Sequence, residues 1–142
     1  MSDEDVIGLM NDLLELESRS LVARLGEARP FVSWAAAEDG PVLQQMVEQE
    51  ADHQRRLVAA IEALDGVPRP ARNDTLSAGL HYLNVQYLLP QIVEEKQRLI
   101  QAYRQAADKT PTDGPAAAVV ANILARHQAH LERLQQMPQR LA

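Results

Sequence analysis

Acidic residues and histidines interrupt the apolar stripes of this 142-residue chain at spacings that favour metal ligation. Glu50 and His53 form a Glu-x-x-His pair, and the stretch ARHQAHLERL at 125–134 carries His127 and His130 with the same spacing. Residues three apart are neighbours on one face of a helix, so each pair can present two ligands to one ion. Carboxylates and imidazoles together suit iron or manganese.

Two further glutamates fall inside apolar stripes. Glu17 shares a helical face with Leu14, and Glu95 shares one with Ile92 and Leu99. A buried charge costs several kcal/mol unless it is paired or ligates a metal. We therefore expect six residues to cluster in one polar layer of the core, where they either pair with one another or ligate metal: Glu17, Glu50, His53, Glu95, His127 and His130. The rest of the run EEKQR at 94–98 is expected to be a solvated face, and Tyr103 a core residue.

Four amphipathic segments can position these residues. Apolar side chains recur with helical spacing over residues 2–27, 39–64, 75–108 and 115–136. Asp-Gly-Pro opens the second and fourth segments, and Pro90 is expected to kink or divide the third. The proline-containing stretch 66–74 is long enough to cross a bundle. The sequence predicts an all-α four-helix bundle with a crossover between its second and third helices, in a single domain 1–142.

Composition limits the classes of partner. The formal net charge of −6 argues against nucleic-acid binding, because nucleic-acid-binding proteins concentrate Lys and Arg. The chain has no cysteine, which excludes thiol catalysis, thiolate metal sites and rubredoxin-type electron delivery within it. It shows no signal peptide and no membrane span, so the expected location is cytoplasmic. The expected partners are a metal ion, a small oxidant and a second copy of the chain in a homodimer.

On these residues the chain resembles the ferritin-like di-iron and di-manganese carboxylate proteins, in particular the small rubrerythrin-like bundles, over nearly its whole length. In that family two helices each give a Glu and the other two each give Glu-x-x-His. The resemblance implies that Glu17 and Glu95 are terminal carboxylates, Glu50 is a bridging carboxylate and His53 is an imidazole ligand.

The last helix departs from the family pattern. If HQAH takes the Glu-x-x-His place, His130 is the imidazole ligand and His127 stands where the second bridging glutamate belongs. If 125–131 is instead aligned with 51–57, His127 is the ligand and Leu124 replaces the glutamate. Either alignment removes one negative charge from the ligand set, so the sequence leaves open whether the site binds one or two ions of iron or manganese.

Two functions follow as hypotheses. The first is a metal-binding protein whose iron or manganese reacts with oxygen or peroxide and takes electrons from an external reductant. The alternative is a metal-free ferritin-like bundle whose degenerate site packs the core while the chain serves as a structural or protein-interaction module.

Overall fold

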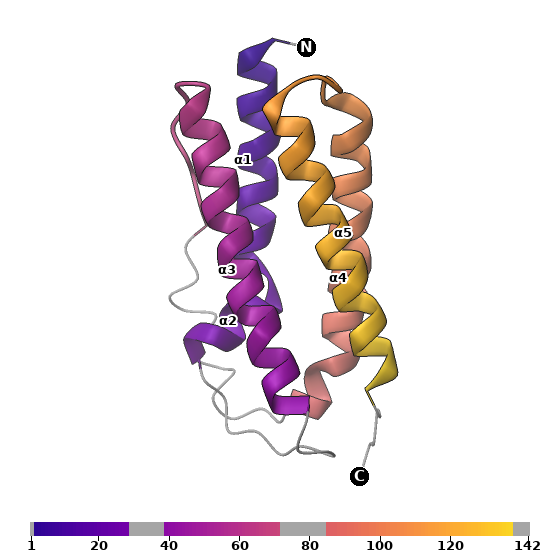
Figure 1. Cartoon of the computed structure of the whole chain (residues 1–142). Coiled ribbons are helices and arrows are strands. Elements are labelled where there is room, and N and C mark those ends of the chain that lie inside the picture. Colours follow the sequence, from indigo (N-terminus) through magenta and orange to yellow (C-terminus); the bar gives the residue numbers. More distant parts are fainter. Residues whose placement is uncertain (1, 29–38, 72–84, 138–142) are drawn as a thin grey trace.

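Four helices form a bundle around the polar residues that the sequence singles out. The computed structural model of the chain describes residues 2–28, 39–71 and 85–137. Every regular element within these residues is a helix: α1 (Asp3–Arg19), α2 (Leu21–Ala28), α3 (Asp39–Ala63), α4 (Val85–Lys109) and α5 (Pro115–Gln136). Helices α1, α3, α4 and α5 form the bundle and the short α2 follows α1 beside α3 (Figure 1), which confirms the predicted all-α fold class.

The chain crosses the length of the bundle between α3 and α4, because these two helices run in the same direction while α1 and α5 run the opposite way (Figure 1). Residues 72–84 lie outside the described residues, as does the predicted start of the third helix at residue 75. The described beginning of the crossover passes along α1. There the Asn11 side chain donates to the Val67 carbonyl at 3.1 Å and accepts from the Arg69 N–H at 2.8 Å.

Local signals explain where the helices begin and end. Ser2 and Asp5 form a reciprocal capping box at the start of α1. Pro115 occupies the first turn of α5, where its missing N–H costs no hydrogen bond. After α3 ends, Asp65 adopts the left-handed conformation, with φ of 62°, and the Gly66 N–H bonds back to the Ile61 carbonyl at 2.9 Å.

One expectation about the helices was wrong. The segment 2–27 is not one helix, because Ser20 is extended, with ψ of 151°, and separates α1 from α2. Of the two outcomes expected at Pro90, a kink or a division, division does not occur, since α4 continues through Pro90. Pro90 lies one turn inside α4, so the carbonyl that its ring disturbs belongs to the helix's first turn.

The core consists of two apolar clusters with a polar layer between them. One cluster lies near α2 and contains Leu21, Val22, Leu43, Met46, Leu89, Ile92, Leu134 and Met137. The other fills the opposite half of the bundle, around Leu14, Leu57, Leu99, Tyr103 and Ile123. On α3, α4 and α5 the buried polar residues fall between these two sets, and on α1 Glu17 follows the last residue of the second set, so the helices bring them to one level of the core.

No described helix is both long enough and apolar enough to span a membrane.

Candidate metal centre

The polar layer contains seven buried side chains from all four bundle helices and the α1–α2 junction: Glu17, Ser20, Glu50, His53, Lys96, His127 and His130. Within it, two groups of three residues place ligand atoms within 4.8 Å of one another. The first group is Glu17, His53 and His127, and we call it the α1 triad. The second is Glu50, His127 and His130, and we call it the lysine triad, because Lys96 lies at its centre. His127 belongs to both.

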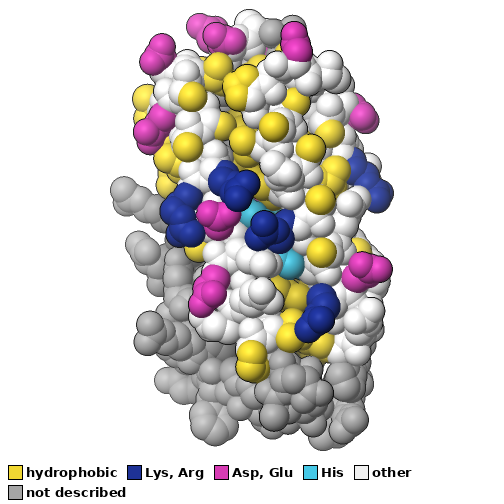
Figure 2. Space-filling view, in the orientation of Figure 1, with side chains coloured by type: hydrophobic (Ala, Val, Ile, Leu, Met, Phe, Trp, Pro, Cys, Tyr) yellow, Lys and Arg dark blue, Asp and Glu magenta, His cyan; other side chains and the backbone are white. Residues whose placement is uncertain are grey.

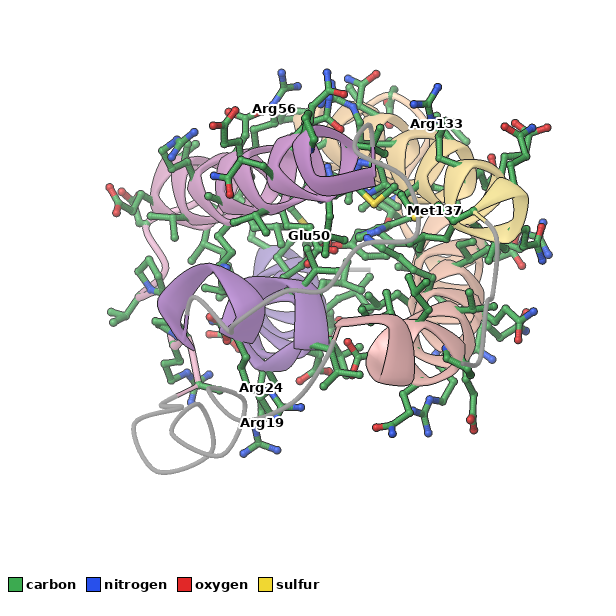
Figure 3. The ribbon with its side chains drawn as sticks, turned by 90° about the horizontal axis from the view of Figure 1, so that it is seen from below. Arg19, Arg24, Glu50, Arg56, Arg133 and Met137 are labelled. Atoms are coloured by element: carbon green, nitrogen blue, oxygen red, sulfur yellow. The ribbon has the colours of Figure 1, made fainter. Side chains whose placement is uncertain are left out.

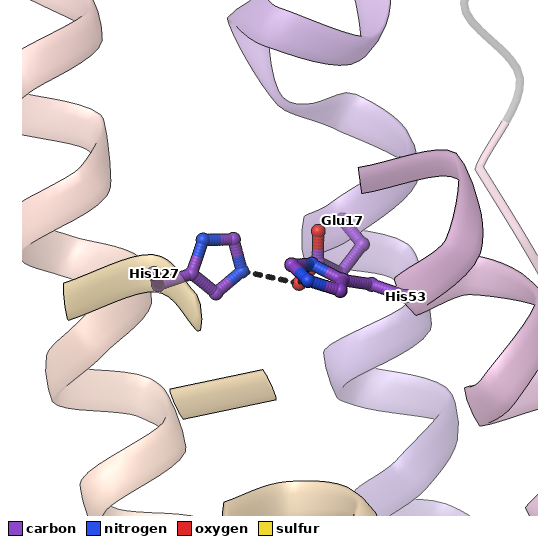
Figure 4. A group of neighbouring side chains, drawn as sticks. All are labelled: Glu17, His53 and His127. Carbon is purple, nitrogen blue, oxygen red and sulfur yellow. Dashed lines mark hydrogen bonds and ion pairs between the residues drawn. The ribbon is translucent and has the colours of Figure 1, made fainter. Parts of the chain in front are cut away.

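In the α1 triad, one oxygen of Glu17 faces two imidazoles (Figure 4). Nε2 of His127 lies 2.5 Å from Oε1 of Glu17, and Nδ1 of His53 lies 3.4 Å from the same oxygen. The ring centroids of His53 and His127 are 4.8 Å apart. The carboxylate of Glu17 on α1 therefore lies between an imidazole of α3 and an imidazole of α5.

Tyr103 adds a second strong donor to Glu17. Its hydroxyl donates to Oε1 at 2.7 Å, and burial followed by the Glu17 charge raises the pKa of Tyr103, which keeps the hydroxyl protonated. Burial alone would raise the pKa of Glu17, but the imidazoles of His127 and His53 outweigh it and hold that pKa well below its usual range. Glu17 is therefore an oriented, ionised carboxylate.

The α1 triad leaves buried polar atoms without hydrogen bonds. Oε2 of Glu17 has no partner, and neither ring nitrogen of His53 makes a hydrogen bond, although the His53 side chain is only 2% exposed. Such an atom costs about 1–3 kcal/mol when it is buried unpaired. These are also the atom types that ligate iron and manganese, so the residues of this half of the layer fit a metal ion.

The lysine triad is satisfied in a different way. Nζ of Lys96 contacts Oε2 of Glu50 and lies 2.9 Å from Nδ1 of both His127 and His130. The hydroxyl of Ser20 donates to the other Glu50 oxygen at 2.5 Å. Seen along the bundle, Glu50 lies inside the ring of helices, whereas Arg19, Arg56 and Arg133 point outward (Figure 3).

Lys96 overturns the expectation of a solvated face at 94–98. Its side chain is 1% exposed and enters the layer, while Glu94, Gln97 and Arg98 are exposed as expected. No signal from periodicity alone could select it, because residues 95 and 96 both fit a stripe that joins Ile92 to Leu99. Lysine is also among the residues that are least often fully buried unless they are paired.

Glu95 belongs to neither triad. It is half-buried, and its Oε1 accepts the Leu21 N–H at 2.6 Å. It therefore satisfies a donor at the start of α2, where the helix dipole favours a negative charge. Of the six predicted ligands, the structure brings together Glu17, Glu50, His53, His127 and His130, and it uses Glu95 as a helix cap.

Burial keeps the α5 imidazoles neutral. It lowers the pKa of His127, and Lys96 adds to that effect against the opposing charge of Glu17. Burial and then Lys96 lower the pKa of His130 to about 2. Because Lys96 supplies only donors, both Nδ1 atoms must accept from it. The Nε2–H of His127 then donates to Glu17, and that of His130 donates to Oε1 of Gln49 at 2.6 Å.

The layer lies close to the surface on one side. On the face formed by α3 and α5, small areas of imidazole show at the surface between Lys and Arg side chains, midway along the bundle (Figure 2). His53 and His130 are 2% and 4% exposed. A small molecule or ion approaching this face would reach the layer over a short distance.

No family model and no curated protein matches the sequence. Among solved structures, the chain is similar to a dodecameric thioferritin, the bacterioferritin-related protein from Bacteroides fragilis, with a TM-score of 0.76 and 21% identity. The match covers 95% of this chain and 84% of that one. The rubrerythrin-like subtype remains a prediction. What the likeness establishes is the fold: this chain is a ferritin-like four-helix bundle. The clustered glutamates and histidines are a feature of this chain's own core.

Proposed function

We propose that the chain binds one iron or manganese ion at the α1 triad and acts as a redox protein on oxygen or peroxide. The observation that carries the proposal is the set of unpaired buried atoms, namely both ring nitrogens of His53 and Oε2 of Glu17. His127 would complete the set by losing the Nε2 proton that it donates to Glu17, so that this nitrogen could bind the ion and one proton would leave for solvent.

The charge of the layer favours a single ion. Among the fully buried described residues it contains two carboxylates, Glu17 and Glu50, and one ammonium, Lys96. Lys96 is paired with Glu50, whereas only neutral donors face Glu17. One negative charge therefore lacks a cation, and it is the charge of the α1 triad.

Iron or manganese held there would supply a redox-active centre that exchanges one electron per chain. Reduction of one peroxide to two waters takes two electrons and two protons, so the proposal includes an external reductant or the cooperation of two chains. The protein's own residues orient the site. Tyr103 donates to Oε1 of Glu17, which leaves the unpaired Oε2 available to a ligand, and the apolar clusters on either side exclude water.

Equilibrium dialysis of the chelator-stripped protein against Fe²⁺ without oxygen, followed by elemental analysis, tests the binding. We expect about one ion per chain. His53→Leu and Glu17→Gln should each weaken binding by more than roughly 100-fold, since even outer partners of metal ligands are worth 10–100-fold. The matched control is Glu15→Gln on the same helix, whose carboxylate is 47% exposed and pairs with Arg19.

His53→Leu separates a ligand from a structural histidine. The ring nitrogens of His53 make no hydrogen bond and its closest polar contact is Glu17 at 3.4 Å, so its replacement should cost the metal-free chain much less stability than it costs metal binding. Unchanged metal binding in His53→Leu would contradict the proposal. Peroxide added to the ferrous protein should then oxidise two irons for each peroxide consumed, measured by absorption and residual peroxide.

A metal-free bundle is the second candidate, and the position of Lys96 favours it, because half of the layer already has its cation. An absence of bound iron and manganese in the dialysis would select this function.

The homodimer is also part of the proposal, and sedimentation velocity checks it. Of the described large apolar residues, Leu16 and Val67 are the exposed ones, at 43% and 72%.

A further inference from the structure

The ammonium of Lys96 occupies the point on which the lysine triad converges. Its Nζ contacts Glu50 and lies 2.9 Å from each Nδ1 of His127 and His130. These three residues are the same ones whose ligand atoms lie close enough together to hold an ion. The lysine is carried by α4, the helix from which the family pattern leads one to expect a carboxylate.

Every hydrogen-bonding atom around this ammonium has a partner. A lysine has three N–H donors, and three acceptors face it. Glu50 receives Ser20 on its other oxygen, and His130 gives its remaining N–H to Gln49. This contrasts with the α1 triad, where Glu17 and His53 keep unpaired atoms.

Charge and chemistry agree with the geometry. An anionic carboxylate and two imidazole nitrogens with available lone pairs are what a divalent ion requires, and they are also what an ammonium requires as acceptors. The two cations therefore compete for one place. An ion is smaller than an ammonium with its hydrogen bonds, since metal–nitrogen bonds are about 2.0–2.1 Å, so the three residues need to close in by less than about 1 Å.

We propose that Lys96 is a built-in substitute for a second metal ion: it neutralises Glu50, blocks the lysine triad and restricts the chain to one ion at most. Replacing Lys96 with a neutral residue of similar length opens a second metal site formed by Glu50, His127 and His130, and His127 would serve both sites after losing its ring proton to solvent. This inference depends on the proposed function in one respect only, namely that the unaltered chain binds one ion at the α1 triad.

The test compares Mn²⁺ binding to the unaltered chain, Lys96→Met and Lys109→Met by anaerobic equilibrium dialysis. Lys109 is the other lysine of the chain, and it is exposed at the end of the same helix, so it receives the same substitution without touching the layer. Lys96→Met should bind one ion more than the unaltered chain, and Lys109→Met should bind the same number.

The counts separate this proposal from the proposed function. One ion in the unaltered chain and two in Lys96→Met support both. None in the unaltered chain and one in Lys96→Met support the substitute cation and reject the α1 site. Equal numbers in the two proteins, or two ions in the unaltered chain, overturn the role of Lys96.

Thermal unfolding keeps the test decisive if Lys96→Met is unstable. Without metal, the variant leaves Glu50 buried without its cation, and its melting temperature should fall by about 10 °C or more. Mn²⁺ should restore most of this loss. The double variant Glu50→Gln with Lys96→Met removes both charges, so it should recover stability without metal and gain no ion. A Lys96→Met protein that stays unfolded in Mn²⁺ would overturn the proposal.

Discussion

His130 must remain an uncharged base for the lysine triad to hold together. Its Nδ1 accepts from Lys96 and its Nε2–H donates to Gln49, so a second ring proton would face an ammonium. The two protonation states therefore differ sharply in energy inside the fold, whereas an unfolded histidine titrates near 6.5. The difference ties the stability of the bundle to pH.

The pKa of His130 is lowered to about 2 by burial and then by Lys96, so the unfolded chain binds more protons between about pH 6.5 and pH 2. Stability is therefore complete above about 6.5 and lost as pH falls below it, by up to about 1.4 kcal/mol per pH unit for this group. Urea unfolding of the metal-free chain from pH 7.5 to 5 measures this. His130→Asn offers an amide oxygen in place of Nδ1 and should show a shallower slope. An identical slope in the variant would assign the acid sensitivity to other groups.

The sequence predicts the burial of some site residues and not of others, because neighbouring apolar residues fix the orientation of only some of them. Apolar residues on both sides place Glu17, Glu50 and His127 in the core, and the structure buries all three. The choice between Glu95 and Lys96 could not be made this way, because one residue of rotation exchanges them. What buries Lys96 is a set of acceptors on α3 and α5, which are distant in sequence.

At the scale of elements, the break at Ser20 shapes one wall of the layer. The Ser20 hydroxyl accepts the Ala23 N–H at 3.1 Å as a helix cap and donates to Glu50. Glu95 takes the Leu21 N–H. The sequence did not reveal this break, because a serine within an apolar stripe is compatible with a continuous helix, and the partners that stabilise the break come from α3 and α4.

Glu95 variants test its role as a cap. Burial raises the pKa of Glu95, although the Leu21 N–H opposes the shift, so ionisation costs stability as pH rises from about 4.5. Glu95→Gln keeps an acceptor and removes that cost, and at pH 7 it should unfold within about 0.5 kcal/mol of the unaltered chain. Glu95→Ala leaves Leu21 unpaired and should lose about 1–2 kcal/mol in urea unfolding. A loss of metal in Glu95→Gln would instead make Glu95 a ligand, as the family resemblance implies.

At the scale of the whole molecule, two helix pairs meet across the layer. Helix α1 packs with α3, and α4 packs with α5. Much of this architecture was predictable: the fourth predicted helix, 115–136, matches α5, and 39–64 matches α3 to within a residue. The regular apolar spacing of these segments is local information. The contacts that close the layer between the pairs are not, so they required the structure.

An ion at the α1 triad would join the two pairs, because Glu17 and His53 belong to one and His127 to the other. Free metal at about 100 times the dissociation constant adds about 2.7 kcal/mol to the free energy of unfolding. For a chain of this length the melting temperature should rise by about 5–10 °C, measured by circular dichroism with Mn²⁺. His53→Leu should show no such rise. A rise that survives in His53→Leu would indicate binding elsewhere.

The charges of the polar layer are divided unequally between the two helix pairs. Among the described residues, both fully buried carboxylates belong to the α1–α3 pair, and the buried ammonium and the tyrosine hydroxyl belong to the α4–α5 pair. Two copies of α1–α3 facing each other would bring four carboxylates together with no cation from either side, and two copies of α4–α5 would bury two ammonium groups without a counter-charge. The division of acid and base between the pairs therefore favours packing of the α1–α3 pair against the α4–α5 pair over packing of either pair against its own copy.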